Sequence, residues 1–128
     1  MADEIVVQAS LAANKSGAAV ASGLLTKSLD MAGDDMETGT TTATDSGVTY
    51  PVPSSIQGGG VGFILVANLG SSEVKAQTTG GTGTDTVLLV PPGAHALFRP
   101  MDPTMTGLVL TTTTAGTTSL VQVWMVEL

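Results

Sequence analysis

The sequence is most distinctive for what it has little of: no cysteine, one histidine, four basic residues and few aromatic ones among 128 residues. Without cysteine, the chain can form no disulfide bond and no thiolate metal site. Four cations against eleven carboxylates give a net charge of −7, so we expect no binding to nucleic acid or to an anionic membrane. Aromatic residues make up 3% of the chain, too few for a platform that stacks sugars or bases.

Long hydrophobic runs and charged residues are both scarce. The longest apolar run, residues 61–67, is the length of a strand and falls well short of the ~18–20 residues that a membrane helix needs.

The first five residues include two acids where a signal peptide needs basic residues, so we expect no export signal and synthesis in a cytoplasm. Charged residues are 12% of the chain, about half of the roughly 25% usual for soluble domains. We therefore expect other protein to cover much of the surface.

What the chain does contain is threonine, glycine and short alternating or apolar segments, a pattern typical of β-structure. Extended segments separated by Gly, Pro and Asp turns predict an antiparallel sandwich. The expected strands are residues 5–9, 48–52, 61–67, 73–77, 87–90, 94–99, 108–112 and 120–128, and residues 28–35 are expected to form a strand that ends in a turn. Residues 11–26 are ambiguous between helix and strand, and we favour extended structure or an arm. Residues 37–46 are expected to form a loop or an edge strand.

The expected core follows from the apolar strands. Residues 61–67 are apolar on both faces of a strand, which predicts a central strand that is covered on both sides. Pro51 and Pro53 exclude a central strand at residues 48–52. The predicted core side chains are Phe63, Leu65, Leu88, Val90, Phe98 and Val123.

His95 and the glycine-rich stretch 80–85 each match only part of a known motif, a catalytic triad and a phosphate-binding loop respectively. A Ser–His–Asp triad would need His95, but this histidine lies mid-strand between two alanines, with no nucleophile elbow around it. A structural or interface histidine is the better interpretation. The glycine-rich stretch 80–85 lacks the Lys-Ser/Thr pair and the helix of a phosphate-binding loop, which indicates a hairpin tip. We therefore expect no enzymatic activity and no cofactor.

Two other groups were weighed as binding sites. Asp30, Asp34, Asp35 and Glu37 could supply oxygen ligands to a cation, although their spacing does not match an EF-hand. The sequence favours a solvated turn there and leaves the cation question open. Tyr50 and Trp124 are too few to form a carbohydrate platform, and Trp124 lies in a terminal strand rich in Val and Met, which favours a core or subunit-interface position.

The stretch from Ser28 to Leu128 resembles a β-sandwich that recurs in small structural proteins of tailed-phage virions, including capsid cement or decoration proteins. The resemblance is carried by Leu-Asp-Met-Ala-Gly-Asp at 29–34, the strand and Asn-Leu-Gly corner at 62–70, and the two strands around Pro-Pro-Gly at 87–99. Asn-Gly and Pro-Gly corners reset the direction of a strand in such a fold.

This resemblance implies an all-β, antiparallel, jelly-roll-like sandwich over residues 28–128, with an N-terminal strand or arm over residues 1–27. It implies a non-enzymatic protein that binds the outside of the capsid, bridges major capsid protein subunits and forms a homo-oligomer, expected to be a trimer. A tail or fibre-attachment protein is the alternative within this class, and a secreted adhesin or carbohydrate-binding sandwich is the alternative outside it. The expected assembly contacts are Ile5, Val7, Tyr50 and Trp124.

Overall fold

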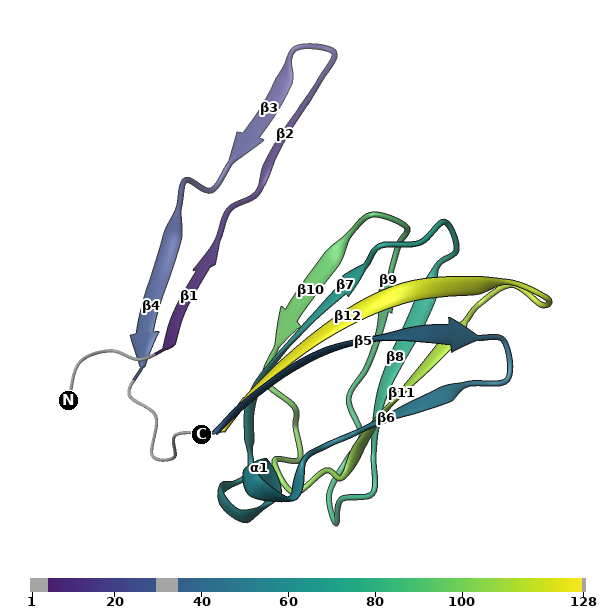
Figure 1. The fold of residues 1–128 in the computed structure, drawn as a ribbon. Helices are drawn as coiled ribbons and strands as arrows, with labels where there is room; N and C mark the ends of the chain where they lie inside the picture. Colours follow the sequence, from purple (N-terminus) through teal and green to yellow (C-terminus); the bar gives the residue numbers. More distant parts are fainter. Residues whose placement is uncertain (1–4, 30–34, 128) are drawn as a thin grey trace. The chain divides into compact units, whose positions relative to one another are not determined.

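The computed structural model describes residues 5–29 and 35–127, and the chain divides into two compact units, Met1–Met31 and Ala32–Leu128 (Figure 1). The expected boundary lies at residues 27 and 28, whereas Ser28 and Leu29 belong to a strand of the first unit. The strands of the first unit are β1 (Ile5–Ala9), β2 (Ala12–Lys15), β3 (Ala18–Ala21) and β4 (Leu25–Leu29).

These four strands form one long antiparallel hairpin, in which β1 pairs with β4 and β2 pairs with β3. The turn between β2 and β3 consists of Ser16 and Gly17, with φ of 52° and 84°. Two successive positive φ values are the mark of a type I′ turn, whose twist matches that of paired strands. The ambiguous segment 11–26 is therefore extended, and its many alanines lie in strands.

A β-bulge separates the two halves of the hairpin. Gly23, with φ of 68°, and Leu24 together lie opposite Ser10, because the register changes by one residue between the β1–β4 and β2–β3 pairs. The backbone N–H of Leu11 donates to Ser22 Oγ at 2.8 Å, and the N–H of Ser22 donates to the carbonyl of Leu11 at 2.8 Å. The pairing thus resumes directly beyond the bulge.

The second unit is a single large sheet with one short helix. Its elements are β5 (Met36–Thr44), β6 (Val48–Pro51), α1 (Ser54–Gly59), β7 (Val61–Asn68), β8 (Val74–Thr79), β9 (Val87–Val90), β10 (His95–Phe98), β11 (Gly107–Thr112) and β12 (Thr118–Glu127). The strand order is β10-β7-β12-β5-β11-β8-β9, and β6 pairs with β11. Figure 1 shows the sheet curling so that β10 and β7 approach β9.

The pairing is antiparallel except at one point, where Thr111 of β11 and Thr44 of β5 form a parallel bridge. The predicted all-β class with mainly antiparallel strands is therefore confirmed, in the form of a nearly closed sheet. β5 pairs with β11 only at Thr44 and otherwise pairs with β12 alone, so of the two expectations for residues 37–46 the loop is wrong and the edge strand holds for most of the segment. Nine consecutive pairs with β12 hold this threonine-rich segment, whose β-branched side chains suit a strand.

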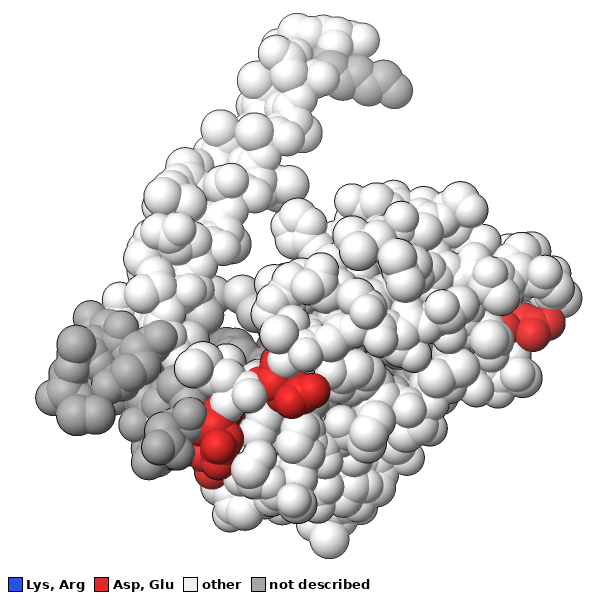
Figure 2. Space-filling model, viewed as in Figure 1, with Lys and Arg blue, Asp and Glu red and all other residues white. Residues whose placement is uncertain are grey.

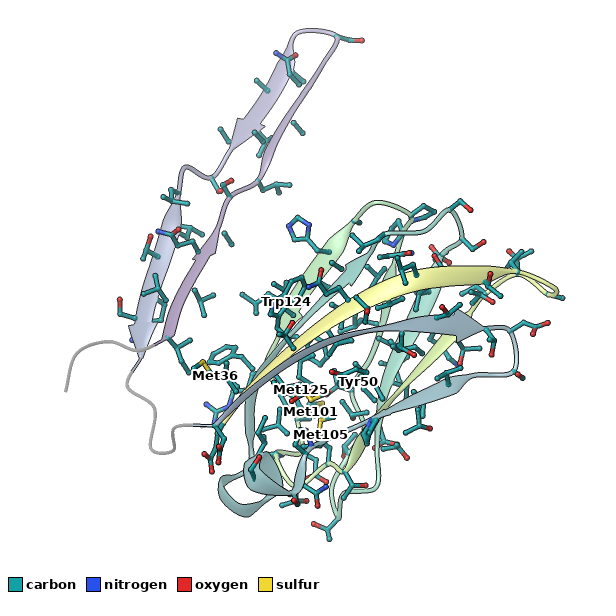
Figure 3. All side chains as sticks on the ribbon, viewed as in Figure 1. Met36, Tyr50, Met101, Met105, Trp124 and Met125 are labelled. Carbon is teal, nitrogen blue, oxygen red and sulfur yellow. The ribbon has the colours of Figure 1, made fainter. Side chains whose placement is uncertain are left out.

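One core lies inside the curled sheet. The strands contribute alternate residues to it, and Ile56 of α1 covers one end. The largest fully buried side chains are Ile56, Ile64, Met105, Leu108, Leu110 and Met125. Figure 3 shows Met105, Met125 and Tyr50 within this enclosed side of the sheet.

Of the six predicted core residues, Val90 and Val123 are fully buried, and Leu88 and Phe98 are partly buried against the core. The prediction for Phe63 and Leu65 is wrong, because β7 directs Ile64 and Val66 inward instead. Since side chains alternate along a strand, Phe63 and Leu65 lie on the outer face. β7 is central, as expected, with β10 and β12 on its two sides.

Asn68, at the end of β7, links β7 to segments that do not pair with it in the sheet. Its side-chain amide donates to the carbonyls of Ser72 at 2.7 Å and Val90 at 2.9 Å. Its Oδ1 accepts from the N–H of Gly70 at 3.2 Å and the hydroxyl of Ser119 at 2.6 Å. The buried amide therefore has all four of its hydrogen bonds. It connects β7 to β9, although these strands do not pair in the sheet.

Candidate functional site

The outer face of strands β10, β7, β12 and β5 carries a row of large apolar side chains. In register, Leu97 lies opposite Leu65, Leu65 lies opposite Trp124, and Trp124 lies opposite Thr38. Directly opposed residues of antiparallel strands share a face, so these four side chains form one line across four strands. Leu97 remains 42% exposed, and Leu65 and Trp124 are half-buried.

A second, shorter row runs beside the first. Phe63 lies opposite Val126 and Val126 lies opposite Met36, with Met36 70% exposed. Figure 3 shows Trp124 and Met36 on the other side of the β12–β5 pair from Met125 and Tyr50. We call these two rows the outer apolar face; its members are Met36, Phe63, Leu65, Leu97, Trp124 and Val126. A contiguous exposed patch of this kind is typical of a surface that contacts another protein.

A shallow open hollow of ≈ 230 Å³ lies where β5 and β12 pair, beside Met36, Trp124 and Val126 of this face. It is lined by Met36, Glu37, Thr38, Trp124, Met125 and Val126. The lining is almost wholly apolar, whereas a small-molecule site usually adds several convergent polar groups. The hollow is therefore suited to receiving an apolar side chain from another surface.

Carboxylates lie next to this end of the sheet. The backbone N–H of Asp35 donates to Glu127 Oε2 at 3.4 Å, and the N–H of Glu127 donates to the carbonyl of Asp35 at 3.0 Å, so Asp35 is tied to the end of β12. Figure 2 shows acidic side chains and, among the described residues, no Lys or Arg on the face that it presents.

Glu37 and Tyr50 form a hydrogen-bonded pair on the inner side of the sheet. The Tyr50 hydroxyl donates to Glu37 Oε1 at 3.2 Å. Burial first, and then the charge and hydrogen bond of Glu37, raise the pKa of the Tyr50 phenol above its usual value. Gly39 makes room for this ring, since a side chain at that position would collide with the Tyr50 hydroxyl.

The four expected contact residues occupy three different places. Tyr50 packs against the core, while Trp124 lies at the centre of the outer apolar face. Ile5 and Val7 lie in the hairpin, opposite Leu29 and Lys27 respectively. The structure thus separates Tyr50 from Trp124 by the thickness of the sheet. Beside Trp124, the outer apolar face contains Phe63 and Leu65, two of the predicted core residues.

The hairpin is itself amphipathic. Alternation along β1 and β2 places Ile5, Val7, Ala9, Leu11 and Ala13 on one face, and the register adds Val20 and Leu25 from the opposite strands. The other face carries mainly polar or small residues, among them Gln8, Ser10, Asn14 and Thr26. A two-stranded ribbon has no core of its own and is marginally stable in water.

The described residues that were considered for catalysis or metal binding are His95, Asp35 and Glu37. His95 is exposed on β10 opposite Ala67. Asp30 and Asp34 lie outside the described residues, and Asp35 and Glu37 make the contacts given above. In residues 5–29 and 35–127, no group of three or more His, Asp or Glu residues could hold a metal ion.

The glycine-rich loop after β8 is held by a carboxylate of its own chain. Asp102 Oδ2 accepts from the N–H of Gly83 at 2.6 Å, and Oδ1 accepts from the hydroxyl and N–H of Thr104 at 2.6 Å and 2.9 Å. These bonds, that of the Thr104 hydroxyl foremost, lower the pKa of Asp102. Sequence reasoning missed this contact, since Asp102 lies 19 residues from Gly83.

No helix in the described part of the chain is both long and apolar enough to span a membrane. No protein-family model, no curated protein and no solved structure significantly matches this chain.

Proposed function

We propose that the chain is a structural, non-enzymatic protein of a tailed-phage virion, a decoration protein that binds the outside of the capsid and bridges major capsid protein subunits. The observation that carries this proposal is the outer apolar face on a domain with very few charges. The resemblance of residues 28–128 to phage virion sandwiches supplies the biological setting. In this proposal the nearly closed sheet is a jelly-roll-like variant of that sandwich.

The mechanism requires only buried surface. A stable contact between two proteins removes about 1,600 Å² of surface from water. Because only the folded proteins make this contact, it stabilises the assembled state over the separate and unfolded chains. Repetition of that contact over a shell would resist internal pressure without any chemical step. The scarcity of Lys and Glu side chains suits such a role, because these residues are depleted from buried interfaces.

The self-assembly within this proposal is a homotrimer. An interface between unlike surfaces of identical chains closes into a ring when the rotation between them is suitable. The hairpin and the outer apolar face are unlike surfaces of this kind, each with exposed apolar side chains.

Immuno-electron microscopy of purified virions from the source of this chain tests the proposal. An antibody raised against the purified protein should label the capsid shell evenly. Label confined to the tail or the fibre base would move the protein to the alternative structural role. Virions without label, or a purified protein that binds oligosaccharides instead, would contradict the proposal.

A further inference from the structure

We propose that the free edge of strand β9 binds the same edge of a second copy of this chain, with the two β9 strands antiparallel about a two-fold axis at Leu88. This inference goes beyond the proposed function, because the contact passes between copies and needs no capsid. It depends on three features of the strand: unpaired backbone groups, exposed apolar side chains and a register that is complementary to itself.

The backbone of β9 is unpaired along one side. The strand lies at one end of the strand order and, among the described residues, pairs only with β8. The N–H of Thr78 donates to the carbonyl of Thr86 at 3.0 Å, so even-numbered residues of β9 direct their backbone groups at β8, since these groups alternate along an antiparallel ladder. The N–H and C=O groups of Val87 and Leu89 therefore point away from the sheet, where another strand can pair with them.

Nothing within the strand protects this edge. Natural sheets cover a free edge or place charged residues, prolines or bulges on it. Residues 86–90 read Thr-Val-Leu-Leu-Val, and their register with β8 is regular. Val87 is 55% exposed and Leu89 is 56% exposed. At the other margin of the sheet, β10 contains His95 and is followed by Arg99, so β9 is the edge better suited to receiving a strand.

A second copy fits this edge because the strand is complementary to itself. When Leu88 faces Leu88 of the second copy, Val87 of each strand lies opposite Leu89 of the other. Both of these pairs can exchange two N–H···O bonds, which satisfies every backbone group left free by β8. Their apolar side chains meet across the strands on the same face of the sheet. A contact of this kind uses one surface twice and closes on itself.

The charges near the edge do not oppose the pairing. The nearest charged residue in the sequence is Asp85, which in this register lies opposite Pro91 of the second copy and far from the second Asp85. Lys75 lies on β8, opposite Leu89, and is one strand away from the contact. Pro91 has no N–H to donate, so the ladder ends there. So short a contact buries much less than the ~1,600 Å² of a standard interface, and we expect weak association that depends on concentration.

Crosslinking of the full-length protein tests the register, because the chain has no cysteine of its own. Val87→Cys and Leu89→Cys are oxidised separately and as an equal mixture, and disulfide-linked dimers are measured on a non-reducing gel. The two positions lie opposite each other with Cα atoms about 5.5 Å apart, within disulfide range, whereas identical positions are two residues out of register. We expect at least about threefold more dimer in the mixture than in either variant alone.

Leu120→Cys is the matched control for random collision. Leu120 is 46% exposed and lies on β12, which has a strand on each side, so it should crosslink no more than the single β9 variants do. A mixture that gives no more dimer than its components overturns the inference. Association of the protein without this crosslink would mean that its copies meet through another surface, and the inference fails in that case too.

Sedimentation velocity tests whether the edge carries the association. We expect the sedimenting mass of the wild type to double as its concentration rises. Leu89→Lys should weaken this step at least about tenfold, because a charged side chain on an edge strand opposes edge-to-edge pairing. Leu120→Lys should leave it unchanged, and circular dichroism checks that both variants keep their β-structure. A wild type whose mass is constant, or a Leu89→Lys variant that associates equally well, overturns the inference.

These outcomes are separate from those of the virion experiment. Even labelling of the capsid without the crosslink would refute the edge contact and leave the proposed function standing. The crosslink without capsid labelling would refute the virion role and leave the edge contact standing.

Discussion

The side-chain amide of Asn68 donates a hydrogen bond of 2.9 Å to the backbone carbonyl of Val90, which links two strands that do not pair in the sheet. Three further bonds satisfy the rest of this buried amide. Asn68→Ala should therefore lower the free energy of unfolding by about 2–4 kcal/mol, because buried partners lose their bonds. Urea denaturation measures the change. Gln77→Ala, which changes a half-buried side chain of β8, is the control. An equal loss of unfolding free energy in this variant would show that the hydrogen bonds of Asn68 contribute nothing particular to stability.

Gly39 is predicted to be replaceable only when the Tyr50 hydroxyl is removed. Gly39→Ala places a methyl group against that hydroxyl and should cost about 1–3 kcal/mol of stability, as overpacking does. Adding Tyr50→Phe should recover part of the loss, and the recovery is measured as the coupling term of a double-mutant cycle. Additive effects of the two substitutions would mean that the ring moves away from Gly39 without cost.

Alkaline stability should depend on Tyr50. Its pKa is raised in the folded protein by burial and by Glu37, so the folded state keeps a proton that the unfolded state loses. The contribution is therefore fully present below pH 10 and falls as the pH rises through the folded value. Between pH 9 and 12, the free energy of unfolding should fall less steeply with rising pH for Tyr50→Phe than for the wild type. Identical slopes would contradict the assignment.

Acid stability should depend on Asp102. Its pKa is lowered by the bonds from Thr104 and Gly83, so its stabilising contribution is present above about pH 4 and is lost as the pH falls through the folded value. Asp102→Asn should lower stability at neutral pH and reduce its further loss in acid. Asp85→Asn, at an exposed position, provides the comparison. Equal pH profiles for both variants would show that the loop contact adds nothing.

The register of β7 can be tested with two neighbouring residues. Ile64→Ala opens a cavity in the core and should cost about 2–5 kcal/mol. Leu65→Ala changes a half-buried side chain of the outer face, and it should lower the free energy of unfolding clearly less than Ile64→Ala does. The comparison is made in dilute solution, where the protein is not assembled. Chemical denaturation of both variants measures the difference. The reverse order of effects would place Leu65 inside, as the sequence pattern suggests.

That pattern explains how far prediction from the sequence could go. β7 is apolar on both faces. The lack of period-two alternation predicts a central strand, but it gives no way to decide whether Ile64 or Leu65 faces the core. The distinction depends on β10 and β12, whose registers are set by residues more than 25 positions away. Threonine-rich β5 offers no apolar stripe, and its place in the sheet follows from its nine pairs with β12.

The candidate site was harder to foresee than the strands. The row of Leu97, Leu65 and Trp124 exists only because three separate strands align, and no local motif records that alignment. The hairpin was foreseeable in part: Lys-Ser-Gly at residues 15–17 is followed by small residues, and a glycine in that place permits the positive φ of a tight turn.

The uneven placement of basic residues also determines how the protein would be digested. Trypsin cuts after Lys and Arg but resists a following proline, which protects Arg99 before Pro100. Lys75 lies in β8, paired on both sides by β11 and β9, whereas Lys27 is exposed in the two-stranded hairpin. Brief digestion should therefore cut first at Lys15 and Lys27, and release residues 28–128 as one resistant fragment. The sheet unit could thus be isolated from the native protein, without genetic truncation.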